Sequence, residues 1–142
     1  MKLSRNIIWL CLFIVGALAG CGSSATGANA EPDRGPDKVQ IQVFEVDPKG
    51  SGPSKTVTFG QADLVRQFYQ TINATAPYPE NAVCTMELGP HYILTFSQGG
   101  KNMMTVTAER YGCQKLTLGK NDLRQGNQQF WHKLDQLITN AS

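Results

Sequence analysis

The segment Lys38–Val46 has the clearest pattern of polar and apolar residues along this chain. It reads Lys-Val-Gln-Ile-Gln-Val-Phe-Glu-Val, and its first six residues alternate between polar and apolar side chains. A period of two is typical of a strand with one face in the core and the other in water. The alternation changes phase at Phe44, which predicts a β-bulge there. We therefore predict a strand of an antiparallel sheet.

The same alternation predicts further strands. Lys55–Phe59 can pair back onto the first strand across a loop rich in proline and glycine. Tyr92–Phe96 and Met104–Ala108 each place their apolar residues on one face, and Ser97–Lys101 between them contains Gly-Gly, so these segments predict a hairpin. A last strand is predicted near Gln114–Leu118, which brings the count to about five.

Two segments have helical spacing instead. Between Gln61 and Asn73 the apolar residues form one stripe, which comprises Leu64, Val65, Phe68, Tyr69 and Ile72. From about Asn127 to Thr139 a second stripe comprises Phe130, Trp131, Leu134, Leu137 and Ile138. We predict a small α+β fold with the element order β-β-α-β-β-β-α, in which two helices pack on one face of the antiparallel sheet.

The amino-terminal segment has the order of a secretory signal. Lys2 and Arg5 precede an unbroken apolar run from Ile7 to Val15. Extended through Ala19, the apolar run spans about 13 residues, or roughly 20 Å of helix, and a bilayer core is about 30 Å thick. We therefore expect residues 1–20 to be an export signal and not a permanent spanning helix.

The end of this segment, Leu18-Ala19-Gly20-Cys21, resembles the lipobox of bacterial lipoproteins. The resemblance implies that Cys21 receives a diacylglycerol and that the chain is cut directly before it. Because two acyl chains hold a protein stably on a membrane, we expect attachment to the extracytoplasmic side of the cell membrane, or to an outer membrane where the organism has one. The alternatives are an ordinary signal peptide with a chance cysteine, or a simple amino-terminal anchor.

Residues 22–37 contain almost no large apolar side chain and several Gly, Ser and Pro residues. Such a segment cannot bury enough surface to offset the entropy of ordering. Residues 21–37 are thus predicted to be the lipidated cysteine and a flexible tether. Residues 38–142 follow as a single domain, because about 105 residues suffice for one modest core.

The charge of the chain changes when the leader is removed. The whole sequence has 13 Lys and Arg against 11 Asp and Glu, a formal charge of +2. Lys2 and Arg5 leave with the leader, so the two signs then balance. Nucleic-acid binding needs a concentrated basic face, and we expect no nucleic-acid partner.

The four cysteines divide between the leader, the lipid and the domain. Cys11 lies in the leader and the lipobox assigns Cys21 to lipid, so Cys84 and Cys113 remain. Two cysteines in an exported domain most simply form one structural disulfide. A redox or metal pair is the competing interpretation, but it favours a C-x-x-C spacing or partner ligands, which this pair lacks.

The carboxy-terminal two thirds have a second resemblance. Its parts are Thr56-Val57-Thr58-Phe59, Cys84, the strand Tyr92–Phe96, Gly112-Cys113 and the helix at Phe130-Trp131. Together they resemble a pattern in uncharacterised exported bacterial proteins. The resemblance implies the paired cysteines and the order of elements, and it carries no catalytic residue.

Candidate catalytic and metal-binding residues are few. His91 and His132 are the only histidines, and neither stands in an H-x-x-x-H, H-E or His-Asp pattern. Five candidate carboxylates are scattered over different elements of the domain: Glu80, Glu87, Glu109, Asp122 and Asp135. Folding could assemble a glycosidase-type pair from them, but no motif indicates one. We assign no catalytic residue, no metal site and no cofactor.

A loose cluster of cations surrounds the last predicted strand. It comprises Arg110, Lys115, Lys120 and Arg124, with Tyr111 beside them. Such a cluster could bind an anionic polymer or lipid head groups. We favour the alternative of a solvated sheet edge, on which lysines discourage the addition of another strand.

These observations predict a non-enzymatic lipoprotein of the cell envelope, whose tethered domain binds a protein or serves an envelope complex. Two other classes stay open. A small hydrolase of wall polymer or peptide would need a pocket with titratable residues in reach of one another. A small-ligand carrier would need a deep apolar cavity between sheet and helices.

Overall fold

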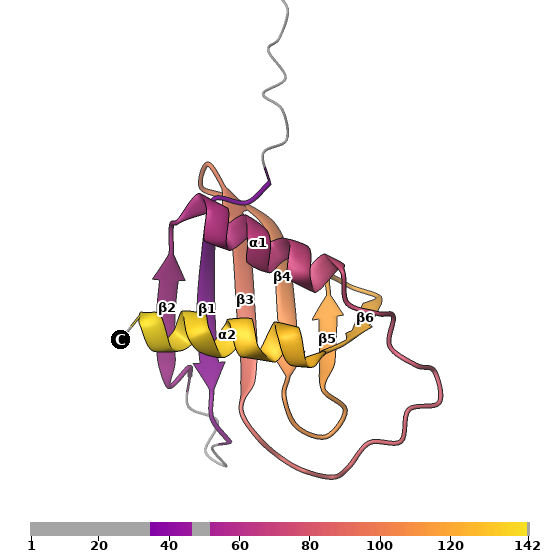
Figure 1. The fold of residues 1–142 in the computed structure, drawn as a ribbon. Helices are drawn as coiled ribbons and strands as arrows, with labels where there is room; N and C mark the ends of the chain where they lie inside the picture. Colours follow the sequence, from indigo (N-terminus) through magenta and orange to yellow (C-terminus); the bar gives the residue numbers. More distant parts are fainter. Residues whose placement is uncertain (1–34, 47–51, 142) are drawn as a thin grey trace, which may run out of the picture. The chain divides into compact units, whose positions relative to one another are not determined.

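The computed structural model describes residues 35–46 and 52–141, and within them the chain forms six strands and two helices (Figure 1). In chain order these are β1 (Lys38–Phe44), β2 (Lys55–Phe59), α1 (Ala62–Asn73), β3 (His91–Gln98), β4 (Lys101–Glu109), β5 (Lys115–Leu118), β6 (Asp122–Gln125) and α2 (Gln128–Asn140). The predicted export signal, Cys21 and most of the predicted tether lie outside the described residues.

The strands form one antiparallel sheet in the order β2-β1-β3-β4-β5-β6. β1 lies between its hairpin partner β2 and β3, so that Ile41 is opposite both Val57 and Leu94. From β3 onward each strand pairs with the next one along the chain. The α+β class and the antiparallel sheet are therefore confirmed.

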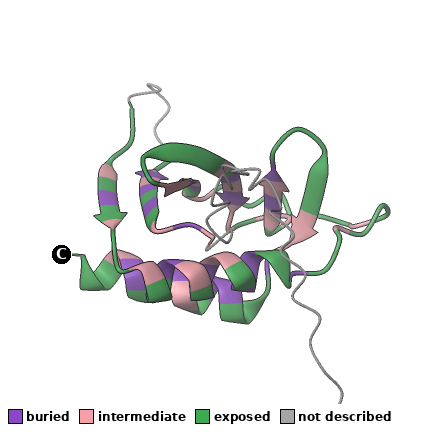
Figure 2. Ribbon diagram, turned by 90° about the horizontal axis from the view of Figure 1, so that it is seen from above, coloured by how far each residue is buried: buried purple, intermediate pink, exposed green. Residues whose placement is uncertain are grey.

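Both helices cover the same face of the sheet (Figures 1 and 2). α2 begins after Asn127, whose side-chain oxygen accepts a hydrogen bond of 2.8 Å from the backbone N–H of Phe130. α1 has Asp63 in its first turn, where the helix dipole favours a negative charge. Neither helix of the described ranges is long and apolar enough to cross a membrane.

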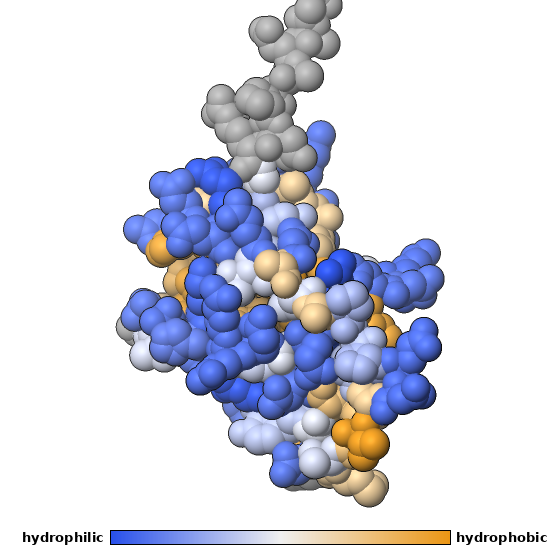
Figure 3. Space-filling model, turned by 45° about the vertical axis from the view of Figure 1, so that its right-hand side comes forward, coloured by the Kyte–Doolittle hydropathy of each residue, from blue (hydrophilic) through white to orange (hydrophobic). Residues whose placement is uncertain are grey.

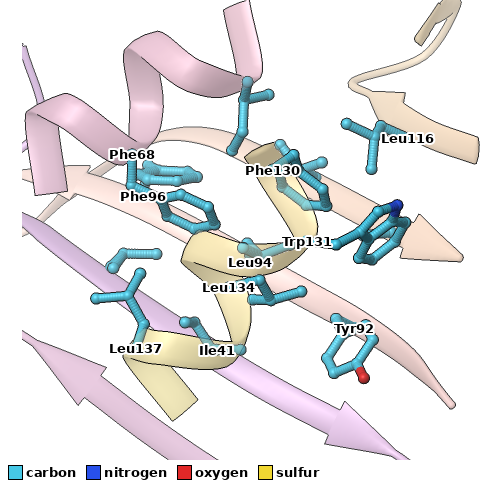
Figure 4. Close-up of a cluster of buried hydrophobic side chains, with 14 of the residues drawn as sticks. Ile41, Phe68, Tyr92, Leu94, Phe96, Leu116, Phe130, Trp131, Leu134 and Leu137 are labelled. Atoms are coloured by element: carbon cyan, nitrogen blue, oxygen red, sulfur yellow. The ribbon is translucent and has the colours of Figure 1, made fainter. Parts of the chain in front are cut away.

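The core lies between the sheet and the two helices (Figure 4). Its largest fully buried side chains come from alternate strand positions and from the helical stripes: Ile41, Phe68, Ile72, Leu94, Phe96, Leu116, Phe130 and Leu134. The two predicted stripes are largely confirmed, but Leu64 is exposed and Tyr69 and Ile138 are only partly buried. The opposite sheet face is polar and carries exposed or half-buried threonines: Thr56, Thr58, Thr95, Thr105, Thr107 and Thr117.

Two details of the strand prediction are wrong. The prediction of five strands misses β6, because its sequence Asp-Leu-Arg-Gln contains one apolar residue, Leu123, and that residue is exposed. The order of elements thus gains one strand before α2. The predicted bulge at Phe44 is absent, since β1 keeps its register with β3 through Phe44 and then ends. The irregularity lies instead between Phe96 and Ser97, where β3 pairs with β4.

Candidate functional site: a loop held by a disulfide

The most exposed apolar side chains of the described residues lie in the connection between α1 and β3. Val83, Met86 and Leu88 are 99%, 100% and 84% exposed. They belong to residues 82–90, which we call the exposed loop. This segment contains no helix, strand, turn or bend. In Figure 1 the connection projects beyond the sheet, and Figure 3 shows strongly hydrophobic side chains protruding at the lower right among mostly polar ones.

The chain reaches the exposed loop along the outer edge of β6. The backbone N–H of Tyr78 donates a hydrogen bond of 2.9 Å to the carbonyl of Leu123. The N–H of Gln125 donates one of 2.8 Å to the carbonyl of Ala76. Because these bonds extend the pairing of the sheet, the start of the connection is fixed before the exposed loop begins.

Cys84 ties the exposed loop to the turn between β4 and β5. It is disulfide-bonded to Cys113, with the two Cα atoms 4.7 Å apart, which confirms the predicted pair. The hydroxyl of Tyr78 lies 3.2 Å from the sulfur of Cys84. The disulfide therefore joins a segment without secondary structure to the sheet.

Gly112, the residue before Cys113, lets the turn lie directly beneath the exposed loop. A Cβ atom at Gly112 would lie 3.0 Å from the carbonyl oxygen of Thr85 and 3.5 Å from that of Glu87. Gly112 also has a φ of +64°, a conformation that side chains other than glycine rarely adopt. The carbonyl groups on both sides of Met86 therefore face this turn.

A second close approach holds the carboxyl end of the exposed loop. A Cβ atom at Gly89 would overlap the ring of Tyr111, so the ring packs against the bare backbone there. Leu88 and Tyr111 also line an open hollow of about 430 Å³ together with Arg110. The exposed loop is thus held near its start by the disulfide, at its middle by Gly112 and at its end by Tyr111.

Arg110 fixes the supporting turn to α2. Its guanidinium pairs with Asp135 at 2.5 Å and lies 5.4 Å from the centre of the Trp131 ring. Beside it, burial raises the pKa of the Tyr92 phenol above the ordinary value of 10.0, and the positive charge of Arg110 opposes this rise. Tyr92 therefore stays neutral at physiological pH. These contacts connect the turn to both β3 and α2.

The other candidates from the sequence are dispersed. His91 is exposed and stacks on Phe44 with ring centres 4.8 Å apart. His132 is exposed and shares a hydrogen bond of 3.0 Å with Gln136. Over residues 35–46 and 52–141, no group of three or more His, Cys, Asp or Glu side chains is placed to hold a metal ion.

Three members of the cation cluster are paired with carboxylates. The pairs are Arg110–Asp135 at 2.5 Å, Lys115–Glu109 at 3.4 Å and Arg124–Asp122 at 2.6 Å. In the last pair, the hydrogen bond from Arg124 lowers the pKa of Asp122. This pairing leaves less free positive charge for an anionic polymer than the sequence suggests.

The sequence interpretation misses the exposed apolar side chains. The predicted pair Cys84–Cys113 locates the connection between α1 and β3 but does not indicate which side chains it exposes. A signal is present, because three large apolar residues stand near Cys84 in a segment without helical periodicity: Val83 directly before the cysteine, and Met86 and Leu88 between it and Gly89-Pro90. Periodicity identifies faces that turn toward a core, and it does not identify apolar side chains that point into water.

No protein-family model matches this chain, and comparisons with curated proteins and with solved structures found no significant match. The function is therefore inferred from the exposed loop, its supports and the side chains that it presents.

Proposed function

We propose that this chain is a lipoprotein of the cell envelope, anchored through Cys21, whose non-catalytic domain binds a partner protein through the exposed loop. The segment 21–37 serves as the tether that lets the domain reach its partner from the membrane. The observation that carries this proposal is the nearly complete exposure of Val83, Met86 and Leu88.

Exposed apolar side chains have a favourable way to become buried, which is contact with another protein. Removing a large apolar side chain from water contributes about 1.5–3 kcal/mol. Apolar side chains scattered singly over a surface need no explanation, whereas clustered ones mark interaction sites. Here three such residues lie within six consecutive positions of the exposed loop. Since the disulfide at Cys84 and the ring of Tyr111 hold the loop near both ends, binding costs it little conformational entropy.

We expect Met86→Asp to abolish capture of the partner. The tagged full-length chain is expressed in its own host, cross-linked at the cell surface and purified, and the captured proteins are identified by mass spectrometry. Met103→Asp is the matched control, because Met103 is 39% exposed and lies near the start of β4, whereas the turn that supports the exposed loop follows the end of β4.

The wild type and Met103→Asp should recover the same envelope protein, and Met86→Asp should lose it while keeping the wild-type melting temperature. Equal capture by all three chains would contradict a role for the exposed loop.

We expect Cys21→Ala to abolish lipid attachment. Cells grown with a labelled fatty acid should label the wild type and the control Cys11→Ala, since Cys11 lies inside the predicted signal. The Cys21→Ala chain should carry no label. Label retained by Cys21→Ala would show that the lipobox assignment is wrong.

The small hydrolase and the small-ligand carrier stay hypotheses of other classes. No observation among residues 35–46 and 52–141 specifically favours either, and we develop neither further.

A further inference from the structure

Resting on the proposed function, we propose that the partner is a serine protease with an apolar specificity pocket. The exposed loop occupies the cleft of this protease as a substrate that is released very slowly, and it thereby inhibits the enzyme. Met86 fills the specificity pocket, and the Met86–Glu87 peptide bond lies at the catalytic serine.

The side chain of Met86 fits an apolar specificity pocket. It is unbranched, apolar and 100% exposed, so a partner can enclose all of it. Serine proteases take the side chain before the cleaved bond into a pocket beside the catalytic serine, and this pocket is an apolar slot in chymotrypsin and contains an aspartate in trypsin. A methionine matches the first kind of pocket.

The backbone around Met86 is presented as in a bound substrate. The carbonyl oxygens of Thr85 and Glu87 both face Gly112, at 3.0 and 3.5 Å from the position of a Cβ atom there. Successive peptide groups of an extended chain point to opposite sides. The carbonyl of Met86 therefore points away from the supporting turn and toward a docking partner. This is the carbonyl that the catalytic serine attacks and that the oxyanion hole binds.

The residues on both sides of Met86 extend the contact. An extended peptide binds such a cleft through main-chain hydrogen bonds and through pockets for some of its side chains. Val83 and Leu88 are exposed on either side of the proposed cleavage position. They supply apolar side chains for the flanking pockets, and the core of the domain does not depend on them.

The supports of the exposed loop explain why it inhibits and is not simply digested. An ordinary substrate leaves because its two new ends separate after cleavage. Here Cys84, two residues before Met86, is bonded to Cys113, and Gly89, three residues after Met86, is packed against Tyr111. The new ends stay side by side, and this proximity strongly favours closure of the bond over release. Because it is held at these two positions, the loop also loses little conformational entropy on binding.

Cleavage of the loop by the protease consumes one water molecule and no other reactant. Hydrolysis of the Met86–Glu87 bond adds one water, which leaves a carboxylate on Met86 and an amino group on Glu87. The disulfide between Cys84 and Cys113 spans the cleavage position, so the two fragments remain covalently joined. Cleaved protein should therefore separate on a gel only after reduction.

The test is inhibition of purified proteases by the purified full-length chain in detergent. Chymotrypsin and subtilisin, a second serine protease with an apolar specificity pocket, should be inhibited at one-to-one stoichiometry. Trypsin, whose pocket is acidic, should not be inhibited. Met86→Lys should weaken the inhibition of chymotrypsin on the order of 100-fold, the size expected at an interface hot spot. The same variant should now inhibit trypsin, because its lysine fits the acidic pocket.

Met103→Lys is the matched control, because it makes the same change of charge near the start of β4, whereas the supporting turn follows the end of β4. It should inhibit chymotrypsin as the wild type does. Melting curves must show that both variants are folded. Rapid cleavage at Met86–Glu87 without inhibition would overturn the proposal, and so would no inhibition of either apolar-pocket enzyme. If Met86→Asp still abolished capture of an envelope protein, only the protease assignment would fail and the proposed function would stand.

Discussion

Replacement of Phe130 by alanine is expected to lower the free energy of unfolding by about 3–5 kcal/mol. Phe130 is fully buried at the start of α2, and its ring lies 5.6 Å from that of Phe68 and 4.7 Å from that of Trp131, measured between centres. It thus joins both helices in the core (Figure 4). The loss would be a large share of the roughly 5–15 kcal/mol that stabilises a typical domain. Urea unfolding followed by circular dichroism measures it.

Phe44→Ala is the matched control for this prediction. Phe44 is half-buried, lies on the polar face of the sheet and stacks on the exposed ring of His91. We expect it to cost about 1 kcal/mol, because little of a cavity forms at the surface. An effect of Phe130→Ala no larger than that of Phe44→Ala would show that the helices are not packed through this residue.

The position of Phe130 also illustrates why much of the fold could be predicted from the sequence. Its helix has one apolar stripe, and β1 alternates polar and apolar residues, because each element has one face in a shared core. β6 could not be predicted in this way. Its one large apolar residue, Leu123, is exposed, and the strand is held by backbone pairing with β5 and with the chain at Ala76 and Tyr78. Backbone hydrogen bonds leave no periodic pattern in the side chains.

The candidate site was predictable only at its covalent bond. Cys84 and Cys113 could be paired by counting cysteines, since an exported domain with two free thiols favours a disulfide. The exposure of Val83 and Met86 depends on how the loop lies over the turn, which is set by contacts between segments far apart in the chain. Gly112 shows the same limit, because the sequence records a glycine and not the two carbonyl groups that it accommodates.

The double replacement Cys84→Ser/Cys113→Ser is expected to lower the free energy of unfolding by about 3–4 kcal/mol, because it removes a cross-link between residues 29 positions apart. Without the cross-link, the unfolded chain regains the conformational entropy that closing this loop had removed. The strand pairing of the folded sheet is unchanged. Thermal unfolding monitored by circular dichroism measures this loss. A melting temperature equal to that of the wild type would show that the disulfide does not stabilise the domain.

The same double variant should also change the exposed loop from an inhibitor into a substrate. Without the bond to Cys113, the chain before Met86 is free to move away after cleavage, so inhibition of chymotrypsin should become transient and cleavage at Met86–Glu87 rapid. Val57→Ala is the control, because Val57 is buried in β2, at the opposite edge of the sheet from β6. It should lower stability without accelerating cleavage, provided that both variants are assayed well below their melting temperatures. Equal cleavage rates in the two variants would show that general destabilisation, and not the loss of the Cys84–Cys113 disulfide, makes the loop a substrate.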